Sequence, residues 1–240
     1  SFWRLDANMQ ASIGNHNTGR LWLGSLAAVL RQVPGYPDAD YAALEARIEN
    51  APLHNGSYAQ GSLLAAVNRD AMFYRQAALE AGYDRQIFLH GQLRIGFEMQ
   101  QRRYPDASTL NGRYQGILMR YADRFWRAEL RFGNDRARAD RAGGNQHRYT
   151  LLLGRDFYTD HGRWHLAYER ESLRDRTGYS PLLDNNRKRH TNKNTYRIEY
   201  TFPWRDIELY AGAELVRQKA TLPLFTTRAN TFYSGLRYLF

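Results

Sequence analysis

The 240-residue sequence contains no cysteine, which excludes disulfide bonds and thiolate-ligated metal sites. It also lacks any run of about 18 apolar residues, so no segment predicts a membrane-spanning helix. Lysine is scarce, and arginine therefore supplies most of the net charge of +10. No secretory signal is visible, so an exported protein would begin here as a mature chain or as part of a longer one. The basic charge fits three kinds of partner: nucleic acid, anionic lipid or anionic solutes.

Aromatic side chains are abundant, with 17 tyrosines, 11 phenylalanines and 5 tryptophans. Many lie where apolar and polar residues alternate, a period typical of a strand between two environments. In one such segment Trp126, Ala128, Leu130 and Phe132 alternate with arginine and glutamate. The same alternation occurs in 3–13, 87–99, 163–171, 195–202, 207–215 and 231–240. Strands are also predicted at 20–30, 58–69, 73–83 and 111–122.

The connections between these segments alternate in length. Short turns are predicted near 123, 160 and 204, and long polar loops at 102–111, 134–146 and 174–192. In an antiparallel sheet of consecutive strands, successive connections lie at opposite ends of the strands. The pattern therefore predicts that the short turns lie at one end and the long loops at the other.

The strands of a soluble β-sandwich and of a membrane barrel would both show alternating apolar and polar residues. Three features favour the barrel. The segments run about 10 to 14 residues, longer than the roughly 5 to 6 of soluble strands and enough for a spanning strand. Aromatic residues lie near the segment ends, as in the girdles of membrane barrels. The polar positions carry both charge signs, which suits a wet lumen. We therefore predict an all-β fold, a closed antiparallel transmembrane β-barrel with long extracellular loops and short periplasmic turns that forms one domain over 1–240.

The number of strands depends on residues 41–50. Alanine and glutamate there favour a helix, yet Ala42, Leu44, Ala46 and Ile48 alternate with Ala43, Glu45, Arg47 and Glu49. The candidates number about thirteen, whereas bacterial single-chain barrels have even strand numbers. We predict twelve strands with 41–50 as a periplasmic helix, or fourteen if the first half holds one more strand.

The last residues alternate in a specific way, with Phe232, Leu236, Tyr238 and Phe240 on one side. This ending resembles the C-terminal signature of Gram-negative outer-membrane β-barrels, except that Ser234 stands where an apolar residue is usual. The resemblance implies an integral outer-membrane protein whose last strand is read by the barrel-assembly machinery. These four residues are the predicted assembly signal.

The stretch "ATLPLFTTRANTFYSGLRYLF" and the long loop before it are similar to the end of surface lipoprotein assembly modifiers, whose barrel follows a periplasmic tetratricopeptide-repeat domain. This resemblance implies the C-terminal part of a longer chain that exports a protein or polymer to the cell surface. Its partners would be a periplasmic repeat domain and an exported substrate. The alternatives are a small-solute porin that prefers anions and an adhesion or receptor barrel that acts through its loops.

Charged residues at the polar positions are the candidate functional residues, because rings of charge set the selectivity of a pore. The alternative is that they form salt-bridge ladders that fill a narrow barrel. The candidate lumen-lining residues are Arg94, Glu98, Arg127, Glu129, Arg131, Arg163, Glu169, Arg197, Glu199, Glu208, Glu214 and Arg237.

We expect no enzymatic activity, cofactor or metal. A phospholipase on the outer wall would need a serine–histidine pair, and no serine lies near His165 in the sequence. Asp160 and His161 lie in a predicted periplasmic turn, away from the rim that a barrel protease would use. The basic segment 187–193 is predicted to contact lipopolysaccharide phosphates or to stay solvated, so nucleic acid is not an expected partner.

Overall fold

The computed structural model describes residues 3–15, 19–32, 40–68, 71–87, 91–205 and 207–238, and these form one antiparallel sheet of thirteen strands. Strands that follow one another in the sequence are neighbours in the sheet. The first strands are β1 (Trp3–Asn15), β2 (Arg20–Gln32), β3 (Tyr41–Pro52), β4 (Gly56–Asn68), β5 (Ala71–Ile87), β6 (Gly91–Arg103) and β7 (Gly112–Ala122). The remaining strands are β8 (Trp126–Ala137), β9 (Gln146–Thr159), β10 (Gly162–Asp175), β11 (His190–Trp204), β12 (Ile207–Ala220) and β13 (Thr227–Tyr238).

Helical structure in these ranges is limited to the short 3-10 turns η2 (Ser108–Leu110), η3 (Asp184–Asn186) and η4 (Pro223–Phe225). None of them has the length or the apolar character to cross a membrane.

The predicted helix at 41–50 was wrong, because these residues lie within β3. Leu26 on β2 and Leu63 on β4 flank Ala46 directly across the two ladders. The helix propensity of alanine and glutamate is worth only tenths of a kcal/mol per residue. Pairing with β2 along the whole segment, and with β4 from Ala42 to Asn50, holds the segment in the sheet and outweighs the propensity.

The predicted strand number also needs correction, since the described residues form thirteen strands rather than twelve or fourteen. Within these ranges the sheet order begins at β1 and ends at β13 without a ladder that joins the two. Closure of the barrel therefore stays a prediction.

The chain divides into two compact units, and each is described by itself. The first consists of residues 1–86, 94–117 and 134–141. Its register sets Met9, Leu26, Ala46, Leu63 and Ala77 in one row across β1 to β5. The face that carries this row, the apolar face of unit 1, is exposed: Met9 and Leu63 are 67% and 65% accessible.

The second unit consists of residues 87–93, 118–133 and 142–240. Here Arg155, Leu166, Ile198, Ala213 and Phe232 form one row across β9 to β13. This row defines the apolar face of unit 2, and Phe232 on it is 84% exposed.

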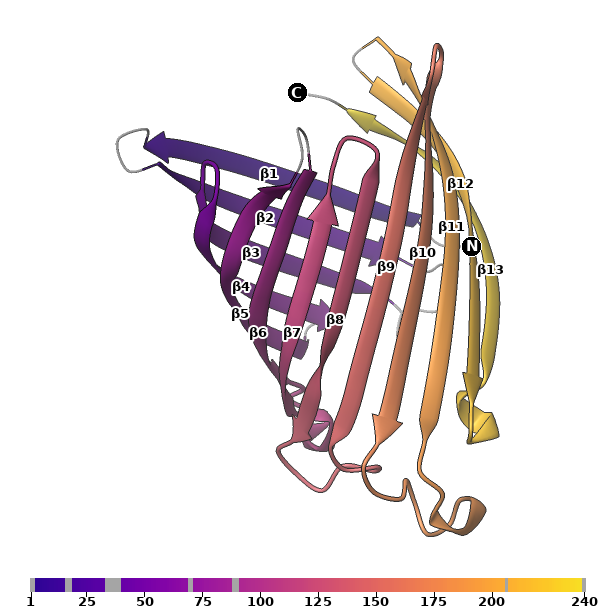
Figure 1. Ribbon diagram of the computed structural model, residues 1–240. Helices are drawn as coiled ribbons and strands as arrows, with labels where there is room; N and C mark the ends of the chain where they lie inside the picture. Colours follow the sequence, from indigo (N-terminus) through magenta and orange to yellow (C-terminus); the bar gives the residue numbers. More distant parts are fainter. Residues whose placement is uncertain are drawn as a thin grey trace. The chain divides into compact units, whose positions relative to one another are not determined.

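The connections of unit 2 confirm the predicted arrangement of turns and loops. The β9–β10 turn lies at the upper end of these strands in Figure 1, and the long 176–189 connection lies at the lower end. At the same lower end, residues 221–226 connect β12 to β13. The ends of the strands are called the short-turn end and the long-loop end below.

The β7–β8 turn is closed by Asp123. Its Oδ1 accepts hydrogen bonds of 2.7 Å from the backbone N–H groups of Phe125 and Trp126, and its Oδ2 accepts one of 2.7 Å from the Tyr121 hydroxyl. The tyrosine bond and then the backbone bonds lower the pKa of Asp123, because they stabilise the ionised carboxylate.

Tyrosine rings lie over glycines on neighbouring strands. Gly82 is directly opposite Tyr58, and a Cβ on Gly96 would overlap the Tyr58 hydroxyl. In unit 2 a Cβ on Gly212 would come within 2.6 Å of the Tyr233 ring, and one on Gly235 within 2.5 Å of the Tyr210 hydroxyl. Glycine is required where a ring occupies the place of a side chain.

Candidate functional site on the polar faces of the sheet

Burial is inverted relative to a soluble protein. Among the described residues, the buried polar and charged side chains outnumber the buried hydrophobic ones by ten to six. Large hydrophobic side chains such as Leu79, Ile48 and Leu236 are instead exposed on the apolar faces. In a soluble fold, acidic residues are almost never fully buried unless they are paired. We call the opposite side of each unit its polar face, and it holds the candidate site.

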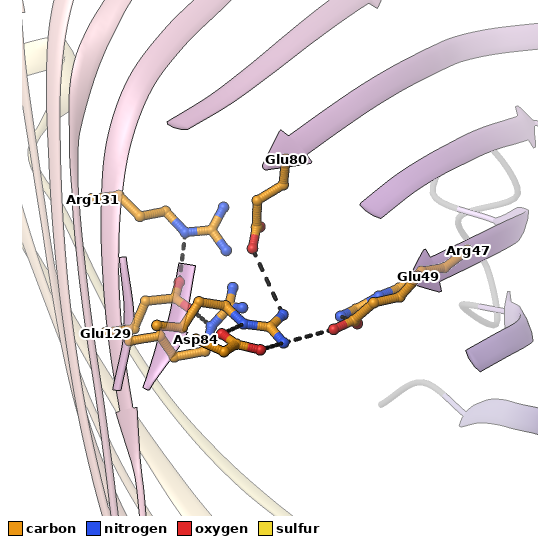
Figure 2. Close-up of polar contacts among 8 residues, drawn as sticks. Arg47, Glu49, Glu80, Asp84, Glu129 and Arg131 are labelled. Atoms are coloured by element: carbon orange, nitrogen blue, oxygen red, sulfur yellow. Dashed lines mark hydrogen bonds and ion pairs between the residues drawn. The ribbon is translucent and has the colours of Figure 1, made fainter. Parts of the chain in front are cut away.

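In unit 1 the guanidinium of Arg94 joins three acidic residues from β3 and β5. Its Nε donates to Asp84 Oδ1 at 2.7 Å, and its Nη2 donates to Glu49 Oε1 at 2.6 Å and Asp84 Oδ2 at 2.8 Å. Glu80 is 3.9 Å away. In Figure 2 the dashed lines from Glu49, Glu80 and Asp84 meet at one unlabelled guanidinium, which these contacts identify as that of Arg94. We call these four residues the Arg94 cluster.

Two further contacts complete the surroundings of the Arg94 cluster. Arg47 Nη2 donates to Glu49 Oε2 at 2.8 Å, and the Arg94 guanidinium lies 4.0 Å from the centre of the Tyr58 ring. Asp84 is fully buried, and the side chain of Arg94 is only 12% exposed. A buried carboxylate requires such compensation, because removing it from water is costly.

A second buried carboxylate lies near the long-loop end of unit 1. Asp135 on β8 pairs with Arg102 on β6 and, at 3.3 Å, with Arg141 in the following loop. The Arg141 Nη2 also donates to the Asp135 carbonyl oxygen at 3.2 Å. These contacts fix the start of the 138–145 connection to the sheet.

In unit 2, two carboxylates near the short-turn end each contact two basic side chains. Glu129 accepts from Arg120 Nε at 2.7 Å and from Arg131 Nε at 2.5 Å. Figure 2 shows the Glu129–Arg131 contact. Asp156 contacts His165 Nδ1 at 2.7 Å and Arg127 at 3.8 Å.

Further pairs follow β10 to β13. Lys193 Nζ lies 2.9 Å from Glu171, and Arg197 Nε donates to Glu214 at 3.0 Å. The Tyr233 hydroxyl donates to Glu199 at 3.2 Å. Near the long-loop end, Asp175 binds Arg189 at 3.1 Å, and the Arg189 guanidinium lies 4.9 Å from the centre of the Tyr179 ring. Charges of opposite sign thus alternate across this face.

Most sequence-predicted charges lie in these networks or beside them. Arg94, Arg127, Glu129, Arg131, Arg197, Glu199 and Glu214 make the contacts above. Glu98 is buried and 3.5 Å from Gln100 Nε2. Arg163, Glu169 and Glu208 lie on the polar face of unit 2 by register. The backbone of Arg237 pairs with Glu208, and its side chain lies outside the described part of the structure.

Several acidic residues of these networks were not among the predicted charges. Glu49 lies in the segment 41–50, for which a helix is predicted. Asp84, Asp135 and Asp156 lie beyond the alternating stretches from which candidates were taken. Asp135 lies four residues after Arg131, so extending the alternation of 126–132 in phase along the strand would have found it. Asp84 directly follows the predicted strand 73–83, and no alternating segment was predicted around Asp156.

Of the predicted assembly signal, Phe232 and Leu236 lie on the apolar face and are exposed. The backbone of Tyr238 pairs with Ile207, and Phe240 lies outside the described residues. Their role in assembly stays a prediction.

The structure contains a serine–histidine contact, but it involves His190 rather than His165. Ser172 Oγ lies 3.3 Å from His190 Nε2, at the long-loop end of β10 and β11. Arg174 Nε is 3.4 Å from the same nitrogen. A general base needs a lone pair free to take the serine proton, and here an arginine competes for it. This contact therefore lacks the geometry of a nucleophilic pair.

No protein-family model and no curated protein matches the chain. Several solved structures are similar in backbone arrangement, and two of them come from Acinetobacter baumannii. OccAB3 is 10% identical with a TM-score of 0.45, over 90% of this chain and 77% of that chain. OccAB4 is 10% identical with a TM-score of 0.45, over 91% and 72%. A similarity at this level identifies no family, and the comparisons do not support the resemblance to surface lipoprotein assembly modifiers.

Proposed function

We propose that this chain is an outer-membrane β-barrel of a Gram-negative bacterium that passes small solutes. The observation that carries the proposal is the inverted burial: carboxylates such as Asp84 and Asp135 are buried, while Leu79 and Phe232 are exposed. An exposed apolar face is stable against lipid, and a face of charges is stable against an aqueous lumen. The strands of 11 to 17 residues are long enough to cross a bilayer.

Small solutes fit the polar faces better than an exported polymer does. The charged side chains are held in place by multiple contacts, as at Arg94 and Glu129. Such a wall presents fixed, hydrated charges that suit ions and small polar molecules. An unfolded polypeptide in transit would bring apolar side chains against it. Export and adhesion through the loops stay alternatives without a specific contact in their favour.

Weak ion selectivity is expected rather than the anion preference predicted from the excess of arginine. On the polar faces arginine is matched by carboxylates, for example Arg197 by Glu214. Part of the excess lies instead on the apolar face of unit 2, where Arg170 and Arg217 are placed by register. Charges that are paired impose little net field on a passing ion.

Conductance across planar lipid bilayers tests the proposal. The purified, refolded chain should give discrete current steps, with a reversal potential near zero in a salt gradient. Membranes that stay silent at every protein concentration would refute the channel. Heat-unfolded protein, added in the same detergent, is the control.

A further inference from the structure

The two faces of β9 to β13 differ completely in acidic residues. Register places every acidic residue of these strands on the polar face. These residues are Asp156, Glu169, Glu171, Asp175, Glu199, Glu208 and Glu214. The apolar face carries cations without a single acid. These cations are Arg155, Arg170, Arg174, Arg217, Lys219 and Arg228, and all except Arg155 lie toward the long-loop end.

Four residues form a continuous row on the apolar face, toward the long-loop end. Arg170 is opposite Asn194, Asn194 is opposite Arg217, and Arg217 is opposite Arg228. We call these residues the cationic row. Like charges directly opposite each other destabilise a sheet, and no described residue forms an ion pair with the three arginines. All three are exposed. The arrangement is unfavourable unless an anion lies against it.

The surroundings of the cationic row add polar contacts and space for a bulky headgroup. Arg174 and His190 lie two positions nearer the loops on the same face, and the Arg174 Nε donates to His190 Nε2 at 3.4 Å. A hollow of about 480 Å³ opens beside Arg170 and Arg174 and is lined by Phe132 and Tyr149.

An apolar groove lies on the other side of the cationic row. It has a volume of about 710 Å³, and its lining includes Leu153, Leu166, Ile198, Ala213 and Phe232. The Tyr168 and Tyr196 rings, 5.1 Å apart, stand between these residues and the row. A ligand that matches the whole surface has an anionic head toward the loops and apolar chains toward the middle of the strands.

We propose that this surface binds lipid A, the phosphorylated and acylated anchor of lipopolysaccharide. Its phosphates would lie on the cationic row, and an acyl chain would occupy the apolar groove. The assignment rests on the proposed function, which puts the long-loop end at the outer leaflet. Charge-assisted contacts from arginine to phosphate are strong, and arginine suits bidentate binding.

Binding of lipid A in detergent micelles tests the site. The variant R170Q/R217Q/R228Q should lose about a hundredfold in affinity, since each cation near a phosphorylated surface contributes roughly fivefold. The single variant R217Q should lose roughly fivefold and serves if the triple variant fails to fold. The matched control is R124Q, because Arg124 is exposed in the β7–β8 turn at the short-turn end, 5.3 Å from the Phe125 ring centre.

Two ligand controls define the chemistry. Dephosphorylated lipid A should bind the wild-type protein far more weakly, and inorganic phosphate at equal concentration should not displace lipid A. Wild-type affinity in the triple variant, or in R217Q should the triple not fold, would overturn the site, as would equal binding of the dephosphorylated lipid. Displacement by inorganic phosphate would make it a free-anion site and refute the lipid assignment.

Conductance separates this inference from the proposed function. The triple variant should conduct like the wild type, because the cationic row lies on the face opposite the polar networks. A protein that binds lipid A through these arginines but forms no channel would leave the lipid site intact and refute the channel. A protein that conducts, but binds lipid A equally well without these arginines, would support the channel and refute the lipid site.

Discussion

At the residue scale, the buried charges of the polar faces depend on one another. Arg94 compensates Asp84 and Glu49 together, so removal of this one guanidinium leaves two carboxylates without their main partner. Arg47, by contrast, is 39% exposed, and among the described residues its side chain is ion-paired with Glu49 alone. The two arginines therefore offer a matched pair of substitutions on the same carboxylate.

We expect Arg94→Gln to lower the free energy of unfolding by about 3–5 kcal/mol, the usual cost of removing one partner of a buried ion pair. Arg47→Gln should cost about 1 kcal/mol or less, because an exposed pair is screened by water. Urea unfolding in lipid vesicles, followed by tryptophan fluorescence, measures both. Equal losses in the two variants would contradict the assigned role of Arg94.

The glycine under Tyr58 is a second position at which one atom matters. Gly96→Ala should destabilise the protein by about 1–3 kcal/mol, because the new Cβ forces the Tyr58 ring and the backbone of β5 to move. The control is Gly24→Ala, where a Cβ meets nothing within 4 Å and the change should stay within about 0.5 kcal/mol. The same urea unfolding assay measures both variants. An unchanged free energy of unfolding in Gly96→Ala would rule out close packing of Tyr58 against this glycine.

At the element scale, each strand separates two environments with a period of two. Consecutive residues therefore lie on opposite faces, as Leu79 and Ala78 do on β5, and the same substitution at each compares the two environments. Leu79 is 65% exposed on the apolar face, and Ala78 lies beside Ser62 on the polar face. In water an exposed leucine would tolerate a charge, whereas in contact with lipid it would not.

Leu79→Arg should cost about 2–4 kcal/mol in a bilayer, the value for a charge on the lipid face of a spanning strand. Ala78→Arg should cost clearly less, because the polar face accepts a guanidinium. The free energies of unfolding from vesicles measure the difference. If Leu79→Arg stayed within about 0.5 kcal/mol, as at a soluble surface, the apolar face would not be in lipid.

At the scale of the whole molecule, the connections define a direction across the membrane. The long 176–189 connection and the β9–β10 turn lie at opposite ends of the same strands. Since the sequence has no cysteine, single cysteines can report on each end without background.

Lys188→Cys should react with a membrane-impermeant maleimide on intact cells, because long loops of bacterial barrels are extracellular. Asp160→Cys should react only after the outer membrane is permeabilised. Both residues are exposed, so accessibility alone does not separate them. Labelling in the reverse order would invert the proposed topology, and no labelling of either after permeabilisation would refute the exposed turns.

Much of the fold could be predicted because alternation is a local property. The strands around Trp126, Trp164 and Tyr196 were recognisable from single segments, and so was the order of turns and loops. No strand was predicted at 146–159, where the structure has β9. Residues 41–50 were a second exception, because their helix propensity conflicts with a pairing that depends on Leu26 and Leu63. That pairing involves residues distant in sequence, which a local pattern does not contain.

The sequence by itself determined which face of each strand is apolar, since the side-chain period of a strand follows from its backbone geometry. Only the tertiary structure decided which charges meet. Arg94 reaches Asp84 and Glu49 because three strands come together, and the cationic row exists because register aligns Arg170, Arg217 and Arg228. Register depends on the pairing of whole strands, so shifting any one of them would separate these residues.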